Sequence, residues 1–374
     1  MNVMEAQAMQ DISLEQRWKN LCRHDLVSGE MPKPDMDDGG VRQPWYIRIM
    51  LGFAGWLGAL FLMGFFAVGF EFILKNAAVA MTVGLVLCAA AYAIFNASRN
   101  SDFMMQFGLA ISMAGQGMVM IGLFNAFKVD NAALYFTALL FQLALVSIMP
   151  NVIHRFLSTL GAVYAAVYLL QVQGIYGLAH GLIAIGFASI WFSTRLLLAP
   201  ALWRPIAYGL SFALLYSEAG RLFSPFYFYS AQGGATMSWW MQYGWWIGSS
   251  LVNLALLATA VMVLQREKLS LASHAGMAAL GACALLCIAG YAAPGLCAAL
   301  MIILVGFAVG NRLLTGIGLL ALLAFISHYY YQMQSTLLVK SAVLASMAMV
   351  LVLMRVGFLR VFLASTNIKE NQGA

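Results

Sequence analysis

Five ionisable residues stand inside or at the edge of long apolar runs: His180, Glu218, Arg221, His328 and Lys340. Ionisable side chains in membrane-like segments are expensive to bury, pair with one another and often mark function. Glu218 and Arg221 are three residues apart and share one helix face. Brought together, the five would bind a polar ligand, carry protons or receive a partner protein. The alternative is that each side chain reaches separately to the lipid headgroups.

Sequence motifs of soluble enzymes are absent. The chain has no G-x-x-x-x-G-K-[ST] phosphate loop, no H-E-x-x-H zinc helix and no G-x-S-x-G nucleophile elbow. Cys283 and Cys287 share a helix face and Cys297 follows, but buried structural thiols explain them better than metal ligation. We therefore assign no catalytic residue, no metal and no cofactor.

Amide side chains also occur deep within the apolar runs: Gln106, Gln116, Gln142 and Asn253. Inside a membrane, such groups bond across helices more often than they line a pathway. We expect interhelical hydrogen bonds from them.

Composition identifies the class of protein. Of 374 residues, 63% are hydrophobic and only 9% are charged, whereas soluble domains average about 25% charged residues. The net charge of +6 is spread over the ends of apolar runs and forms no dense basic patch, which argues against nucleic acid as a partner. The partner that this composition requires is the lipid bilayer.

Hydropathy over windows of about 19 residues predicts an all-α integral membrane protein, a bundle of about 12 transmembrane helices. Residues 1–44 form a polar segment with a short amphipathic helix from Ser13 and a proline-rich linker. Residues 45–363 form the transmembrane domain and 364–374 a tail. The spans are predicted near 47–70, 76–95, 103–125, 132–149, 153–171, 175–198, 203–223, 243–264, 272–290, 292–309, 313–331 and 337–355.

The positive charges orient this bundle. With a cytoplasmic N-terminus, all but four of the 20 Lys and Arg residues fall on the inside; the four are Lys75, Lys128, Arg221 and Lys340. Cytoplasmic loops carry the excess of Lys and Arg, so both termini are predicted to be cytoplasmic.

This orientation places the five ionisable residues at a similar depth in the membrane. His180 to Arg195 spans roughly 22 Å and Arg204 to Glu218 roughly 21 Å, so all five fall near the outer boundary. The one long outer loop, 224–242, is dense in aromatic residues, which favour the headgroup level or a docking surface.

Two stretches carry a family resemblance. Pro44-Trp45-Tyr46-Ile47-Arg48, and Tyr329-Tyr330-Tyr331 through Ser335 to Ser341, resemble the start and end of a group of uncharacterised bacterial multi-pass proteins, domain of unknown function 4401. The resemblance implies a bacterial inner-membrane location. It also implies a partner protein, which is small and membrane-anchored and carries a GDYXXLXY motif. It transfers no activity and no catalytic residue.

Three functions remain open. The leading prediction is a non-catalytic inner-membrane subunit that binds a membrane-anchored partner at its outer face. The alternative is a transporter or permease for a small solute, with a polar site in the outer leaflet. The third is an intramembrane enzyme with Glu218 or His328 as general base.

Overall fold

The computed structural model describes residues 75–97, 102–128, 131–223, 239–293 and 295–332, with single residues scattered over 22–68 and 338–352. The chain divides into two compact units, Met1–Gly52 and Phe53–Ala374, and the second is described here. The predicted amphipathic helix, the spans near 47–70 and 337–355, most of the outer loop, Lys340 and the tail lie outside the described residues.

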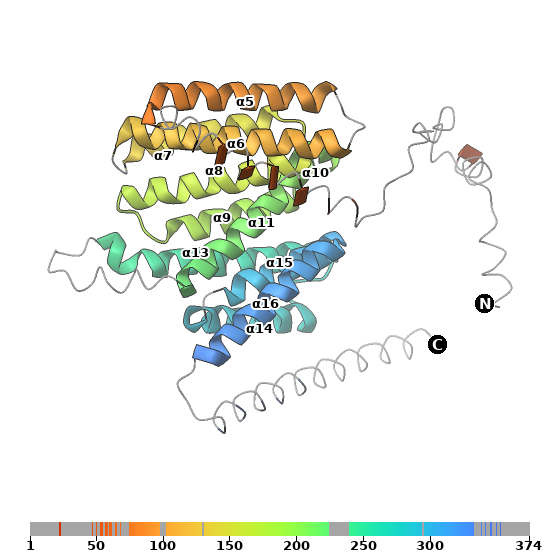
Figure 1. Ribbon diagram of the computed structural model, residues 1–374. Coiled ribbons are helices and arrows are strands. Elements are labelled where there is room, and N and C mark those ends of the chain that lie inside the picture. Colours follow the sequence, from red (N-terminus) through yellow and green to blue (C-terminus); the bar gives the residue numbers. More distant parts are fainter. Residues whose placement is uncertain are drawn as a thin grey trace. The chain divides into compact units, whose positions relative to one another are not determined.

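The second unit is helical, and no strand occurs among its described residues (Figure 1). The helices are α5 (Ala77–Ala97), α6 (Asp102–Phe127), α7 (Ala132–Ile148), α8 (Val152–Val172), α9 (Leu178–Trp191), α10 (Arg195–Leu198), α11 (Pro200–Phe223), α13 (Trp239–Arg266), α14 (His274–Ala292), α15 (Leu296–Val309) and α16 (Arg312–Gln332).

Five of these helices are long and apolar enough to cross a membrane: Ala77–Ala97, Phe103–Phe127, Val152–Val172, Gln242–Arg266 and Arg312–Tyr331. The described part of the chain is thus all-helical, with five candidate membrane-spanning helices. The single span predicted over 175–198 is instead divided, because Ser193 interrupts the helix and its Oγ accepts a hydrogen bond from Arg195 N (3.2 Å). The resulting α9 has only 14 residues.

Local sequence signals set several helix starts. Asn131 begins α7 by accepting a hydrogen bond from Leu134 N at 2.9 Å, and Asn151 begins α8 in the same way with His154 N at 3.0 Å. A side-chain oxygen at this position satisfies an amide that has no partner within the helix. Asn151 thereby fixes where His154 lies at the start of α8.

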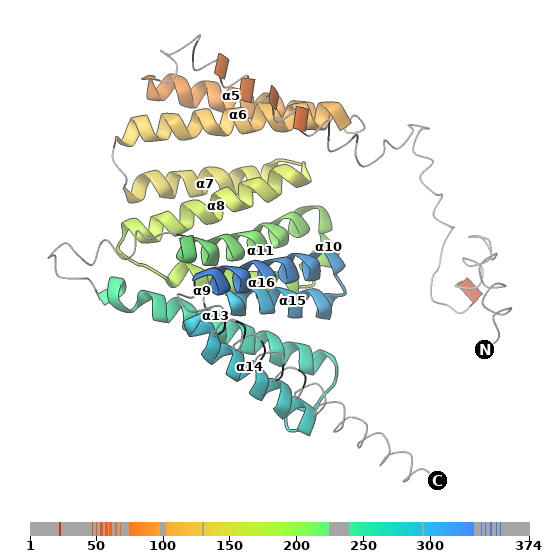
Figure 2. The ribbon, with the colours of Figure 1, turned by 60° about the horizontal axis from the view of Figure 1, so that its bottom comes forward.

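Neighbouring helices pair along the chain, α5 with α6, α7 with α8 and α15 with α16, as Figure 2 shows. Contacts from farther along the sequence place α11 against both α8 and α9, and α9 against α13. Small residues permit the closest pairing. A Cβ on Gly84 would lie 2.6 Å from Gly115 O, so α5 and α6 approach through glycine.

The outer surfaces of these helices are apolar. Leu197, Ile288, Leu320 and Phe307 are each at least two-thirds exposed. Exposed apolar area of this extent is unusual for a protein in water and is expected where lipid covers it.

Candidate functional site

The structure places the sequence-predicted residues on three helices. His180 lies near the start of α9 and is 5% exposed, and Glu218 lies near the end of α11 and is 2% exposed. His328, near the end of α16, is half-buried with its ring edge-on to Tyr329. Arg221 belongs to α11, but its side chain, like Lys340, lies outside the described residues.

His180 contacts the turn of α11 that carries Glu218. Its Nε2 lies 3.1 Å from Ser217 O and its Nδ1 lies 3.0 Å from Gly177 O. Glu218 itself lies near enough to Cys297 of α15 to interact with it electrostatically. The structure therefore brings His180 beside the Glu218 segment. A single site that also includes His328, Arg221 and Lys340 stays a prediction.

Gly177 positions His180. It precedes α9 with φ of 79°, a conformation that favours glycine. A Cβ on Gly177 would collide with the backbone of Gly244, so α9 begins in direct contact with α13. The His180 ring then lies 5.2 Å from that of Trp245. Because both neighbours of the imidazole nitrogens are carbonyl oxygens, a neutral ring donates to one of them and an imidazolium donates to both.

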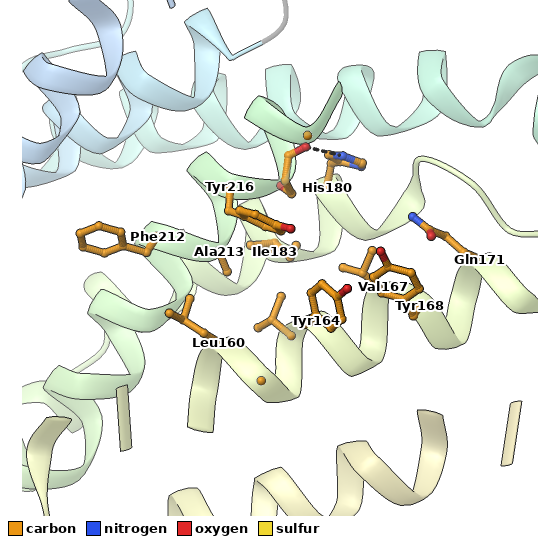
Figure 3. A pocket seen from close by; sticks show the side chains of 14 residues that line it. Leu160, Tyr164, Val167, Tyr168, Gln171, His180, Ile183, Phe212, Ala213 and Tyr216 are labelled. Atoms are coloured by element: carbon orange, nitrogen blue, oxygen red, sulfur yellow. Dashed lines mark hydrogen bonds between the residues drawn. The ribbon is translucent and has the colours of Figure 1, made fainter. Parts of the chain in front are cut away.

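A cavity of about 620 Å³ opens beside His180, between α8, α9 and α11 (Figure 3). Its volume falls within the range of about 300–1,000 Å³ for small-molecule sites. Most of the wall is apolar, with Leu160, Val167 and Ile183 among the side chains that form it. The polar lining consists of Tyr164, Tyr168, Gln171, His180, Tyr216 and Ser217.

Tyrosines dominate that polar lining. The rings of Tyr164 and Tyr168 lie 4.4 Å apart, and Tyr135 of α7 stacks behind Tyr168 at 5.4 Å. The phenol groups of Tyr168, Tyr216 and Tyr135 all lie near enough to that of Tyr164 to interact with it electrostatically. Figure 3 shows Tyr164 and Tyr168 from α8 and Tyr216 from α11 pointing into the same space.

The cavity is open at its tyrosine side. Tyr164 is 46% exposed and Tyr216 is 66% exposed. Because both residues lie within helices, away from the loops at the helix ends, the opening faces the surface that lipid would cover. A ligand would then enter sideways from the bilayer.

Our sequence reasoning missed these tyrosines because it searched for charge. A signal was nevertheless present. Tyr164, Tyr168 and Gln171 recur at intervals of four and three residues, so they form one polar-tipped stripe on an apolar helix.

A second polar cluster, the buried His154 cluster, lies nearer the start of α8. It comprises Ser112 and Gln116 of α6, Gln142 of α7, and His154 and Ser158 of α8. Ser112, His154 and Ser158 are fully buried. The predicted interhelical hydrogen bonds are confirmed for three of the four deep amides, since Gln142 bonds to Gln116, Gln116 to His154, and Asn253 to Cys287 O.

Two amide hydrogen bonds of this cluster lead from Gln142 through Gln116 to His154. Gln142 Nε2 donates to Gln116 Oε1 (3.1 Å), and Gln116 Nε2 donates to His154 Nε2 (3.0 Å). The imidazole nitrogen that accepts is unprotonated, so Nδ1 carries the hydrogen and faces Ser158 Oγ at 3.3 Å. Ser112 Oγ lies 2.7 Å from Nε2. A neutral histidine thus satisfies its neighbours Ser112, Gln116 and Ser158, while Gln142 Oε1 has no hydrogen-bond partner among the described residues.

The thiols do not form a metal centre in the described part of the chain. No group of three His, Cys, Asp or Glu residues is arranged there to hold a metal ion. Cys287 Sγ and Cys297 Sγ instead donate to backbone carbonyls, those of Asn253 and Leu286.

Comparison with known proteins gives a family and no activity. A family model described as a domain of unknown function (DUF4401) matches residues 44–361. No curated protein and no solved structure matches the chain. A site can therefore be assigned only from the geometry above.

Proposed function

Since the chain belongs to the DUF4401 family, whose function is unknown, we propose its function from the site: it binds a small membrane-soluble molecule in the cavity between α8, α9 and α11. The observation that carries this proposal is a cavity of about 620 Å³ whose wall is mainly apolar and whose polar groups converge on one side. That combination is typical of small-molecule sites. It favours the carrier or permease function over catalysis.

The same proposal includes a location. Both termini are cytoplasmic, the membrane is the bacterial inner membrane, and the cavity lies in its outer half. The distribution of Lys and Arg supports this orientation. His180 and Glu218, at the cavity and beside it, fall near the outer boundary in that orientation.

Two matched glycine variants test the cavity. Gly220 lines it, and a Cβ there would meet nothing within 4 Å. Gly316 of α16 has equally open surroundings and does not line the cavity. Gly220→Leu therefore narrows the cavity, while Gly316→Leu makes the same chemical change elsewhere in an apolar helix.

The measurement is equilibrium dialysis of the full chain in lipid nanodiscs against radiolabelled n-decyl amphiphiles with neutral, cationic and anionic headgroups, with empty nanodiscs subtracted. We expect saturable binding of at least one amphiphile, reduced about fivefold or more by Gly220→Leu and less than twofold by Gly316→Leu. No saturable binding, or equal binding by the two variants, would overturn the proposal.

A specific observation also favours the second function, a membrane subunit that binds a small membrane-anchored protein. Trp239, Tyr243 and Trp246 at the start of α13 are exposed, and Trp239 and Tyr243 lie 5.7 Å apart. Exposed aromatic side chains are enriched at protein interfaces. Co-expression with the membrane-anchored GDYXXLXY protein tests this function. Trp246→Ala should reduce co-purification severalfold, whereas Phe307→Ala, which truncates another exposed aromatic side chain on α15, should not.

A further inference from the structure

We infer that the ligand of this cavity is a lipophilic cation, a quaternary ammonium group on an apolar tail. The inference rests on the proposed function and names the chemical class that the cavity would take. It follows from the aromatic side chains that line the cavity and from the lack of charged side chains among the described residues of that lining.

The aromatic rings supply the attraction for positive charge. Tyr164, Tyr168 and Tyr216 converge on one space, and Phe212 lines the cavity away from these three rings. The face of an aromatic ring carries partial negative charge, so a cation held over several rings is stabilised, and more strongly where water is excluded. Cages of aromatic rings bind quaternary ammonium groups in this way.

The charge of the cavity lining narrows the chemical class of the ligand further. Among the described residues that line the cavity there is no Lys, Arg, Asp or Glu. Carboxylate and phosphate ligands are commonly held by Arg or Lys, so an anionic headgroup finds no cationic side chain among these described residues. A small, strongly hydrated cation would lose its water without receiving a carboxylate in exchange. A quaternary ammonium group has no hydrogen-bond donor and spreads its charge over its methyl groups, which suits rings and aliphatic walls.

The shape of the cavity supports a tail. Leu160, Val167, Ile183 and Ala213 form an apolar floor next to the rings, and an apolar tail can pack against them without leaving a buried polar group unpaired. The opening lies beside the exposed Tyr164 and Tyr216. The tail of an amphiphile already dissolved in the bilayer can enter with its headgroup at the tyrosines.

The first test compares two ligands on the unmodified protein. The probes are n-decyltrimethylammonium and its neutral isostere, in which carbon replaces the nitrogen, each measured by equilibrium dialysis against the full chain in nanodiscs. We expect the cation to bind about tenfold more tightly. Equal binding of the two probes would show that the cavity does not select a cation, and the inference would be wrong. If Gly220→Leu then abolished the binding of both probes, the proposed function would still stand. Absence of saturable binding by either probe would overturn both.

Paired substitutions then identify the group that acts. Tyr164→Phe and Tyr216→Phe keep the ring and remove the hydroxyl, whereas Tyr164→Leu and Tyr216→Leu remove the ring. We expect the Phe variants to bind n-decyltrimethylammonium within about threefold of the wild type and the Leu variants to lose about tenfold. Binding of the neutral isostere should change much less in the Leu variants. If the Phe variants lose as much as the Leu variants, the hydroxyls bind the ligand and the inference is wrong. Should a Leu variant fail to fold, the comparison of cation with isostere on the unmodified protein decides alone.

Discussion

Helix α8 has two polar faces, and they differ in how their groups are satisfied. On the first face, His154 and Ser158 are fully buried and bonded to each other and to α6. On the second, Tyr164 and Tyr168 interact with other phenols and border an open cavity. Buried polar groups that satisfy one another stabilise the packing of helices. Polar groups that converge on empty space are the ones available to a ligand.

The difference also explains why a conspicuous residue type is a poor guide here. His154 has the side chain most often associated with proton transfer, yet its partners close around it. The tyrosines are common residues of membrane interfaces, yet they surround the cavity. Accessible space beside the polar group, more than the chemistry of the group alone, separates the two faces of α8.

The largest expected effect comes from His154→Leu. The change leaves Ser112, Gln116 and Ser158 without the imidazole that each contacts, and an unsatisfied buried polar group costs about 1–3 kcal/mol. We expect the free energy of unfolding to fall by about 2–4 kcal/mol, measured by denaturation in mixed micelles. His328→Leu on the half-buried ring of α16 should lower it by less than about 1 kcal/mol. Equal losses would show that His154 is not the centre of a cohesive cluster.

Gly161→Ala tests how firmly Gln142 is held on the sealed face. A Cβ on Gly161 would lie 2.9 Å from Gln142 Cδ. The methyl group would displace the Gln142 amide and strain its bond to Gln116. We expect a loss of about 1–2 kcal/mol in unfolding free energy in the same denaturation assay. Unchanged stability would show that the Gln142 side chain can shift freely and does not support the cluster.

How far the sequence predicts these features depends on the range of the interaction that sets them. Hydropathy predicted ten segments that correspond to described helices, and Asn131 and Asn151 lie where a cap signal would be read. These are local effects. The division of 175–198 was missed because a polar stretch of only three residues, Ser193-Thr194-Arg195, separates two apolar runs.

The sites were harder to predict because they depend on neighbours. His154 stands at the predicted edge of a span, where exposure to headgroups would be expected, and it is buried only because α6 presents Ser112 and Gln116 to it. The cavity arises from the contact of α8 with α11, whose residues Tyr164 and Tyr216 are separated in the sequence by α9 and α10. Periodicity identifies a face of a helix, but it does not identify the helix that meets that face.

Ser158→Ala should have a smaller effect than either change above. Ser158 Oγ lies 3.3 Å from His154 Nδ1, at the long end of hydrogen-bond distances. Interhelical and side-chain hydrogen bonds in membranes average about 0.6 kcal/mol. We expect unfolding free energy to fall by about 0.5–1 kcal/mol in the same denaturation assay. A loss as large as that of His154→Leu would mean that Ser158, by holding Nδ1–H, fixes the tautomer on which the whole cluster depends.

Tyr164→Phe should have the smallest effect on stability, which gives the clearest contrast with the sealed face. The Tyr164 side chain is 46% exposed, and its hydroxyl borders the cavity. Removing that hydroxyl leaves no enclosed group without a partner, so the unfolding free energy should change by less than about 0.5 kcal/mol. Tyr92→Phe on α5, where the side chain is 41% exposed, provides the matched control and should behave alike. If Tyr164→Phe instead destabilises the protein by more than about 1 kcal/mol, the tyrosines stabilise the fold as His154 does. The cavity would then not be the ligand-binding site.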